Sequence, residues 1–334
     1  MSDLLPMKMT YGAIQGSDRL RDAICTMYAK QTRENIVVTH GAIGANALVH
    51  ETLIEPGDHV ISVRPTYQQH YSIPESYGAD VDILQLRPEN GFLPNLAELK
   101  AMVRPETKLI VLNNPNNPTG ALMEAEALDA FVAIARSCDA FVLCDEVYRG
   151  TNQIGDGFAP AMADVYEKGI SVAGMSKTFS LAGLRLGWIA APLDVLEAVS
   201  IHRDYNTISV GMLDDYFAAM ALETKDKILA RSQQITRGNL AILDAWVADE
   251  PSMSYVKPKA GTTALLKYDF DMPSRDFCIQ LLQQTGVMFT PGSVMHMEGW
   301  LRVGYANDPE ILRTGLAKVS GFLAGLAANS GSAA

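Results

Sequence analysis

A lysine between two apolar runs is the feature of this sequence with the clearest chemical potential. Lys177 lies between residues 170–173 and 186–191, and both runs have the length and composition of buried strands. A buried ammonium is costly unless it is paired or neutralised, and one stable solution is a Schiff base with a carbonyl cofactor. Ser176 precedes the lysine, and Arg185 follows among small residues that would let an anion approach. The stretch predicts a Schiff base beside a phosphate site, although a surface turn with an ordinary Lys and Arg fits it too.

Two other apolar runs end in polar groups. Asp145 directly follows residues 141–144, and a carboxylate there is desolvated unless it has a cationic partner. A protonated pyridinium nitrogen is one such partner. Residues 113–120 read Asn-Asn-Pro-Asn-Asn-Pro-Thr-Gly, and two Asn-Pro steps fix an extended, turning backbone. A rigid polar loop after a buried strand serves a site more often than it forms a plain solvated turn.

Three weaker signals complete the set. Residues 41–45 are small, and at the start of a helix they would expose backbone N–H groups that bind anions, although many strand-to-helix turns have this composition. Tyr67 offers a flat face for an aromatic ring or simply packs in the core. Arg302 lies in the run 300–305, where its planar fork suits a carboxylate or a surface salt bridge.

Taken together, these stretches resemble the class I/II pyridoxal-phosphate aminotransferases of fold type I. Residues 176–187 match the pattern Ser-Lys-x-x-x-x-x-Gly-x-Arg-x-Gly, and residues 114–120 match Asn-Pro-x-Asn-Pro-Thr-Gly. One departure is Gly174, where many members carry a phosphate-binding Ser or Thr. The resemblance runs from Tyr11 to about Leu323.

The resemblance implies a role for each residue. The implied catalytic residues are Lys177, which holds the cofactor and moves a proton, Asp145, which keeps the ring nitrogen charged, and Tyr148. The implied ligands of pyridoxal 5′-phosphate are the amides of Ala42 and Ile43 with Ser176 and Arg185 at the phosphate, Tyr67 stacked on the ring, Asn117 and Tyr148 at the ring oxygen, and Tyr11 from a partner subunit. The implied substrate-binding residues are Arg302, at the α-carboxylate, and Asn117. No metal site is expected.

The elements that must position these residues follow from hydrophobic periodicity. Seven apolar runs predict strands at 36–39, 59–63, 81–86, 109–113, 141–144, 170–173 and 186–191. Amphipathic stretches predict helices at 19–30, 44–53, 96–102, 124–137, 194–202, 212–223, 225–248, 274–285 and 308–327. Later strands are predicted at 262–268, 287–290 and 301–305. Apolar strands alternating with helices indicate an α/β fold with a mostly parallel sheet, whose strand carboxyl ends gather ligands.

We therefore expect four parts. Residues 1–222 form a large domain that binds pyridoxal phosphate on a seven-stranded, mostly parallel sheet, and residues 1–11 are a shortened N-terminal arm. Residues 223–250 are an interdomain helix, residues 251–327 a small α+β C-terminal domain, and residues 328–334 a disordered tail.

Composition narrows the function class. The chain has 334 residues, a formal net charge of −11 and 48% hydrophobic residues, and this acidic balance argues against nucleic acid as a partner. Its longest apolar stretches are strand-length, which argues against a membrane span. Residues 1–11 lack a signal-peptide pattern, and the four cysteines have neither zinc nor redox spacing. We expect a cytoplasmic protein with reduced thiols.

The predicted function is an aminotransferase that moves an amino group between an amino acid and a 2-oxo acid, in a homodimer with shared sites. One alternative is another pyridoxal-phosphate reaction: that of a cyclase, lyase, racemase or oxidase of unusual amino acids. A second is an inactive relative used for binding, which predicts a missing Lys, Asp or Asn, and none is missing. Arg203 is a candidate contact for an acidic substrate or a helix-end cation.

Overall fold

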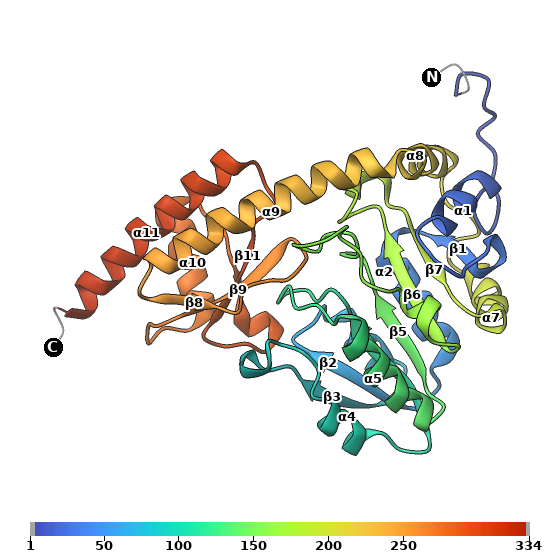
Figure 1. Ribbon diagram of the computed structural model, residues 1–334, viewed down its shortest axis with the longest axis horizontal. Helices are drawn as coiled ribbons and strands as arrows, with labels where there is room; N and C mark the ends of the chain where they lie inside the picture. The colour runs from blue at the N-terminus through green and yellow to red at the C-terminus, as the bar shows by residue number, and fades with distance from the viewer. Residues whose placement is uncertain (1–3, 332–334) are drawn as a thin grey trace.

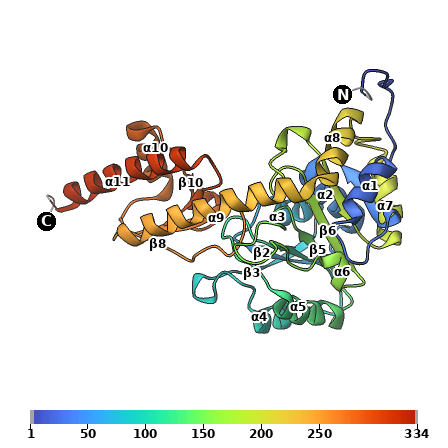
Figure 2. The same ribbon diagram turned by 45° about the horizontal axis from the view of Figure 1, so that its top comes forward.

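A computed structural model describes residues 4–331 of the chain, with side chains described as far as residue 328. The chain forms two β-sheets, each covered by helices, and one long helix joins them (Figure 1). Figure 2 shows this helix, α9 (Lys225–Asp249), running from the larger body to the smaller one.

The larger sheet has seven strands in the order β1-β7-β6-β5-β4-β2-β3. The strands are β1 (Ile36–Thr39), β2 (His59–Arg64), β3 (Asp80–Gln85), β4 (Thr107–Asn113), β5 (Phe141–Asp145), β6 (Gly169–Gly174) and β7 (Gly187–Ala190). Strand β7 runs antiparallel to both of its neighbours, and the other pairs are parallel. The predicted seven-stranded, mostly parallel sheet is confirmed.

Helices cover both faces of this sheet. They are α2 (Gly41–Leu53), α3 (Gln69–Ser76), α4 (Leu96–Met102), α5 (Ala125–Ser137), α6 (Met162–Val165) and α7 (Leu193–Arg203). Side chains of β4 alternate between the two resulting cores: Ile110 and Leu112 pack in the core that contains Phe131 of α5, and Leu109 and Val111 in the core that contains Leu48 of α2. A strand buried on both faces needs apolar residues at every position, which explains the unbroken apolar runs.

Helices α1 (Asp18–Cys25) and α8 (Met212–Glu223) pack against each other at one end of the sheet. The hydroxyl of Ser17 accepts a hydrogen bond from the amide of Leu20, as expected of an N-cap. The predicted extent of this first helix, 19–30, is wrong at its end. The amides of Ala29 and Lys30 donate to the carboxylate of Asp164 instead, at 2.8 and 3.0 Å.

The smaller sheet is antiparallel, with strands in the order β10-β11-β9-β8. Its strands are β8 (Met253–Tyr255), β9 (Thr263–Tyr268), β10 (Thr290–Pro291) and β11 (Trp300–Gly304), and its helices are α10 (Ser274–Thr285) and α11 (Pro309–Gly331). Short 3₁₀ helices occur at η1 (Arg33–Asn35), η2 (Pro88–Asn90), η3 (Ala182–Leu184) and η4 (Gly292–Met295).

Several terminal and local predictions differ from the structure. Helix α3 and strand β8 were not predicted, and the strand expected at 287–290 is reduced to β10. The tail expected to be disordered from residue 328 is helical through Gly331, and residues 332–334 lie outside the described residues. The boundaries of the four predicted parts stay predictions.

Helix α11 is the one helix in the described chain whose length and composition would suit a membrane span, over Pro309–Ala328. Its buried side chains pack in the core of the smaller body, namely Leu312, Leu316, Val319, Phe322 and Leu323. These five side chains form an apolar face of the helix that packs against the core of the smaller body.

Candidate active site

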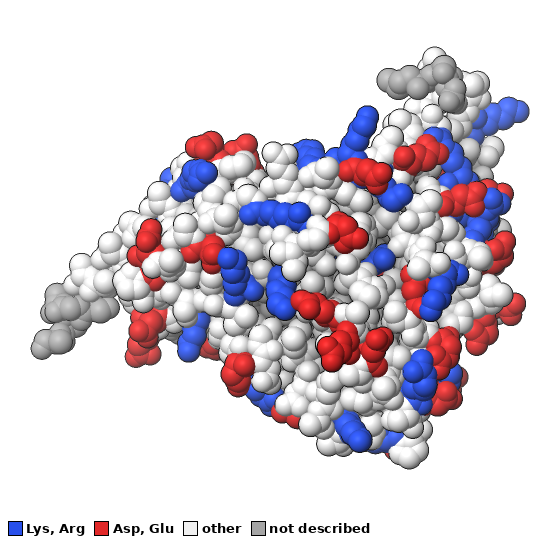
Figure 3. All heavy atoms as spheres, viewed as in Figure 1, with Lys and Arg blue, Asp and Glu red and all other residues white. Residues whose placement is uncertain are grey.

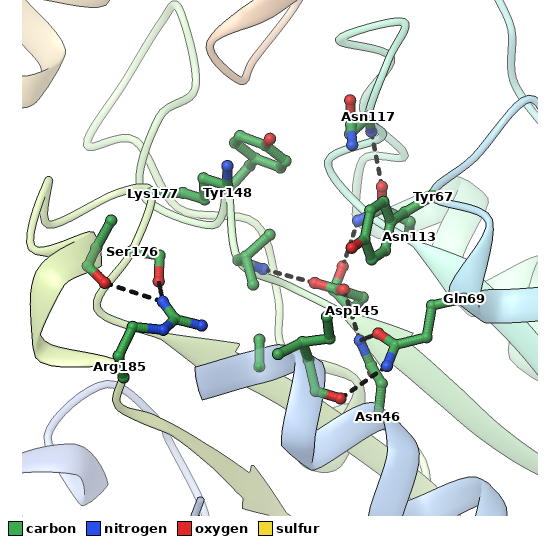
Figure 4. Close-up of a pocket in the computed structure, with 14 residues that line it drawn as sticks. Asn46, Tyr67, Gln69, Asn113, Asn117, Asp145, Tyr148, Ser176, Lys177 and Arg185 are labelled. Carbon is green, nitrogen blue, oxygen red and sulfur yellow. Dashed lines mark hydrogen bonds between the residues drawn. The ribbon is translucent and has the colours of Figure 1, made fainter. Parts of the chain in front are cut away.

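A cavity of about 260 Å³ lies where β4, β5 and β6 end and α2 begins. Its wall contains nine of the residues predicted from the sequence: Ala42, Ile43, Tyr67, Asn117, Asp145, Tyr148, Ser176, Lys177 and Arg185. Figure 4 shows their side chains arranged around this space, with Lys177 and Asp145 facing it from different strands. The parallel strands bring these residues together because their carboxyl ends meet at one edge of the sheet.

One end of the cavity is built on the N-terminus of α2. The first amides of a helix have no partner within the helix, and His40 at its N-cap forms no side-chain hydrogen bond to them. Gly41 has φ +67°, and a Cβ there would lie 2.9 Å from Nη2 of Arg185. At Gly187 a Cβ would lie 2.4 Å from the nitrogen of Ala42. Two glycines thus allow the guanidinium and β7 to approach the helix start closely.

Arg185 and Ser176 face the same helix start. Nη1 of Arg185 donates to the carbonyl of Ala182 at 2.9 Å and to Oγ of Ser176 at 3.4 Å. Its guanidinium forms no ion pair with any carboxylate in the described chain. A free guanidinium, a hydroxyl and the amides of a helix N-terminus together form a site suited to a phosphate group.

Lys177 follows β6, and its amine lies in the open cavity. Partial burial lowers the pKa of Lys177, helped by the positive charges of Arg302 and Arg185 and opposed by Asp145. A lowered pKa increases the fraction of neutral amine, which is the form that attacks a carbonyl carbon.

Asp145 ends β5 and is 5% exposed. Its Oδ2 accepts a hydrogen bond from Nδ2 of Asn46 at 2.9 Å, and its Oδ1 accepts one from the amide of Val147 at 3.1 Å. Nε2 of His70 lies 3.4 Å from Oδ2. No Lys or Arg of the described chain forms an ion pair with this carboxylate, so a cationic ring nitrogen would find a charge partner there.

The Asn-Pro loop after β4 is fixed to the end of β5. Asn113 donates through Nδ2 to the carbonyl of Asp145 at 2.8 Å and accepts from the amide of Asn117 at 2.7 Å. Arg302 on β11 donates through Nη1 to Oδ1 of Asn117 at 3.5 Å and through Nη2 to Thr290 at 3.2 Å. Arg302 is not in the cavity wall, but this contact joins it to the rim.

The two tyrosines in the cavity wall differ in exposure. Tyr67 is 43% exposed, and its ring meets that of His70 edge-on with centroids 6.2 Å apart. Tyr148 is 3% exposed, and burial raises its pKa to about 12. Its phenol therefore keeps its proton at neutral pH and remains a hydrogen-bond donor.

Two further predicted residues, besides Arg302, lie outside the cavity wall. Tyr11 is 80% exposed and does not line the cavity of its own chain, so its role at a partner subunit stays a prediction. Arg203 ends α7 and is completely buried, with no hydrogen-bond partner for its guanidinium among the described residues. The suggestion that Arg203 contacts substrate is wrong for this structure, since its side chain reaches neither the cavity nor the surface.

The sequence analysis missed other residues of the wall, namely Asn46, Gln69, Asn113, Val147 and Ala182. Asn46 carried a signal, because it is the only polar residue in the apolar stretch 45–49. Gln69 carried none, because the first turn of α3 was not predicted.

These residues fit pyridoxal 5′-phosphate. The phosphate matches the α2 amides with Ser176 and Arg185, and the ring nitrogen matches the carboxylate of Asp145. The aldehyde carbon matches the amine of Lys177. Among the described residues, no group of three or more His, Cys, Asp or Glu side chains is placed to hold a metal ion.

Comparisons with known proteins agree with this fit. The family model for aminotransferase class I and II matches residues 6–319. A solved structure of a pyridoxal-phosphate-dependent aminotransferase from Streptococcus suis superposes with a TM-score of 0.94 at 45% identity, covering 97% of this chain and 86% of that one.

Two curated relatives are more distant. Capreomycidine synthase from Streptomyces vinaceus is 29% identical over 310 residues, covering 92% of this chain and 79% of the relative. An aspartate/prephenate aminotransferase from Thermus thermophilus is 27% identical over 326 residues, covering 95% and 84%. The chain therefore belongs to the class I and II aminotransferases, a family that depends on pyridoxal phosphate.

Proposed function

We propose that this enzyme transfers an amino group between an amino acid and a 2-oxo acid, with Lys177 as the residue that carries the reaction. The observation that supports this most directly is an amine of lowered pKa in a cavity that also holds a buried carboxylate, Asp145. The guanidinium of Arg302 contributes to that lowered pKa, which indicates that it acts on the same space.

Bound pyridoxal phosphate supplies an aldehyde carbon and a ring that accepts electrons. The amides of Ala42 and Ile43, the hydroxyl of Ser176 and the guanidinium of Arg185 would hold the phosphate. Asp145 would place a negative charge opposite the ring nitrogen. Tyr148 and Asn117 would donate hydrogen bonds to the ring oxygen, and Tyr67 would cover the ring face.

Lys177 would have two tasks in this arrangement. Its amine would hold the cofactor through the aldehyde carbon. Once a substrate amine has taken that place, Nζ would be free to accept and donate a proton next to the substrate Cα. A lowered pKa helps both tasks, because a larger fraction of the amine is then neutral.

Arg302 would bind the substrate α-carboxylate. Its planar guanidinium can grip both carboxylate oxygens, and its present partners are two neutral oxygens at 3.2 and 3.5 Å. Neutral partners at such distances are readily exchanged for a charged one. Asn117, which accepts one of these bonds, lies where it would help to orient the same carboxylate.

We further propose a homodimer with shared sites. Large apolar side chains are exposed on the N-terminal segment and α8, namely Met9, Tyr11, Ile14, Leu213, Phe217 and Met220. Such a surface suits burial against a second copy, and a two-fold axis makes the exchange reciprocal. Tyr11 would then reach the phosphate of the partner. We also propose a cytoplasmic location, which the four free thiols support.

A single half-reaction tests the proposal. The loaded enzyme is incubated with one amino acid at a time and no 2-oxo acid, and the cofactor is released and identified by mass. Transamination predicts the amino form of the cofactor in an amount equal to the 2-oxo acid formed. Product formation with the cofactor recovered only in its aldehyde form would contradict the proposal.

A second candidate is a different reaction on the same cofactor, such as cyclisation. The similarity to capreomycidine synthase favours considering it, because that relative is not named as an aminotransferase. The fold does not decide between these reactions. The half-reaction above separates them, since a cyclase or lyase returns the aldehyde form after each turnover.

A further inference from the structure

Two neutral side-chain amides form a hydrogen-bonded chain on the side of the cavity where β5 ends and α2 begins. We call this side the floor of the cavity. Nδ2 of Asn46 donates to Oδ2 of Asp145 at 2.9 Å and to Oε1 of Gln69 at 3.3 Å. Nε2 of Gln69 in turn donates to the carbonyl of Ile43 at 2.7 Å. Figure 4 shows both amides between the end of β5 and the first turn of α2.

The direction of every bond in this chain is fixed by chemistry. An ionised carboxylate only accepts, so Asn46 must turn its NH₂ group toward Asp145. The second N–H of that group then points to the oxygen of Gln69, and the NH₂ group of Gln69 must face the carbonyl of Ile43. No alternative amide orientation satisfies both ends of the chain.

Asn46 is placed where a helix would ordinarily carry an apolar residue. It is 1% exposed, and its neighbours Ala45, Leu48 and Val49 are in the apolar core beside α2. Burying an amide there costs free energy unless its polar atoms are bonded, and its Oδ1 has no hydrogen-bond partner within the described protein. Asn46 also lines the cavity, so this unfavourable burial of an amide occurs at the candidate active site.

We propose that Asn46 and Gln69 are positioning residues, which hold the Asp145 carboxylate toward the cofactor ring and tie it to the turn that binds the phosphate. Asn46 fixes the carboxylate from the side of α2. Gln69, on α3, bonds to both Asn46 and the carbonyl of Ile43, so it holds the Asn46 amide and the first turn of α2 in place. The inference rests on the proposed roles of Asp145 and the Ile43 amide.

The proposal predicts that substitutions of Asn46 and of Gln69 weaken the binding of different parts of the cofactor. Asn46→Leu keeps the side-chain size but removes the donor to Oδ2, so the carboxylate is held only by the amide of Val147 and the nearby His70. Gln69→Leu frees both Asn46 and the turn at Ile43. Asn239→Leu is the matched control, because Asn239 is also a buried helical asparagine that donates two bonds, to Tyr305 and Asn307, outside this cavity.

Binding to the cofactor-free protein is measured with three probes: inorganic phosphate, pyridoxal and pyridoxal phosphate. We expect Asn46→Leu to weaken pyridoxal and pyridoxal phosphate by about tenfold, as for a lost bond to a charged group, and to leave phosphate unchanged. We expect Gln69→Leu to weaken all three probes, by roughly threefold. Asn239→Leu should lower thermal stability and change none of them.

The loaded enzyme supplies a second readout. Asn46→Leu should lower kcat and leave KM for the amino substrate within about twofold, because Asn46 acts through Asp145 and touches no substrate carboxylate. Binding of pyridoxal to folded Asn46→Leu as tightly as to the parent protein would overturn the proposal. An equal loss for Asn239→Leu would overturn it too. The binding arms use no turnover, so they stand even if the reaction proves not to be transamination.

Discussion

The two charged walls of the cavity are built differently. On the floor, Asp145, Asn113 and Asn46 are between 1% and 5% exposed, and each is bonded to another protein group. On the loop after β6, Lys177 and Arg185 are exposed, and neither forms an ion pair within the described chain. The floor carries the negative charge and the loop the positive ones.

This difference shows which side of the cavity is already hydrogen-bonded within the protein before a ligand binds. Buried polar groups must be hydrogen-bonded within the protein, so the floor is fixed when the chain folds. The exposed guanidinium of Arg185 can remain hydrated at little cost until a ligand binds. Partial burial of Lys177 instead lowers the pKa of its amine. We infer that the floor sets the orientation of the ligand, whereas the cations of the loop gain a charge partner only when the ligand binds. On the face seen in Figure 3, acidic and basic side chains are interspersed.

The largest expected effect comes from removing the amine on the loop side. Lys177→Ala should abolish covalent attachment of the cofactor and lower transamination by at least about 10²–10⁴-fold, since the proton-transferring group is lost. Attachment is measured by mass after borohydride reduction. Lys100→Ala, on the exposed surface of α4, is the control. A Lys177→Ala protein that still carries the reduced cofactor would contradict the assignment of Lys177 as the attachment site.

Removing the charge on the floor should have the next largest effect. Asp145→Ala should still bind the cofactor covalently but lose turnover equivalent to roughly 3–5 kcal/mol, the cost of leaving a buried charge without its partner. Turnover and attachment are measured on the same sample. Asp139→Ala, which removes a surface carboxylate paired with Lys168, should change neither. A loss of only a few-fold in Asp145→Ala would show that the floor does not orient the ring.

A third prediction concerns Glu146, next to Asp145 in the chain, and its effect on the free energy of unfolding. Burial raises the pKa of Glu146 to about 7 from an ordinary value of 4.5, against the opposing effects of Arg149 and of hydrogen bonds from Met162 and Ser171. The folded protein therefore binds the proton more tightly, and the free energy of unfolding should fall as pH rises from about 4.5 to about 7. The shift corresponds to roughly 3 kcal/mol.

Glu146→Gln should remove this part of the pH dependence and leave the protein more stable above pH 7 than its parent. Thermal melts across the pH range measure it. Glu167→Gln is the control of opposite sign, because the hydrogen bond from Arg136 lowers the pKa of Glu167 to about 2 on the exposed surface. Parallel curves for Glu146→Gln and the parent protein would show that the buried acid does not control stability.

The smallest effect is expected where a second copy would complete the loop side. Tyr11→Phe should weaken cofactor binding by about 0.5–1.5 kcal/mol, the contribution of one hydrogen bond. Mixing Tyr11→Phe with Lys177→Ala subunits should give heterodimers with one intact site, which binds the cofactor with the affinity of the parent protein. Full activity from a monomer by light scattering, or heterodimers that bind the cofactor only as weakly as Tyr11→Phe homodimers, would exclude a shared site.

The sequence by itself determined the local features of this protein. Continuous apolar runs specified all seven strands of the larger sheet to within about two residues, since a strand buried on both faces tolerates little else. The residues at the ends of those strands, such as Asp145 and Lys177, were recognisable because a charge after an apolar run is costly without a purpose. The order of strands brought them to one edge.

Only the tertiary structure decided features that depend on groups distant in the chain. The first helix ends at Cys25, and the amides of Ala29 and Lys30 donate to the carboxylate of Asp164 rather than extending the helix toward residue 30. Asn46 meets Asp145 across 99 residues of sequence, a contact that no local pattern encodes. Arg203 is of a residue type that usually lies at the surface, but in this structure it is buried. Tertiary packing determines which partners stabilise a buried polar group. The periodicity of a single segment does not predict that packing.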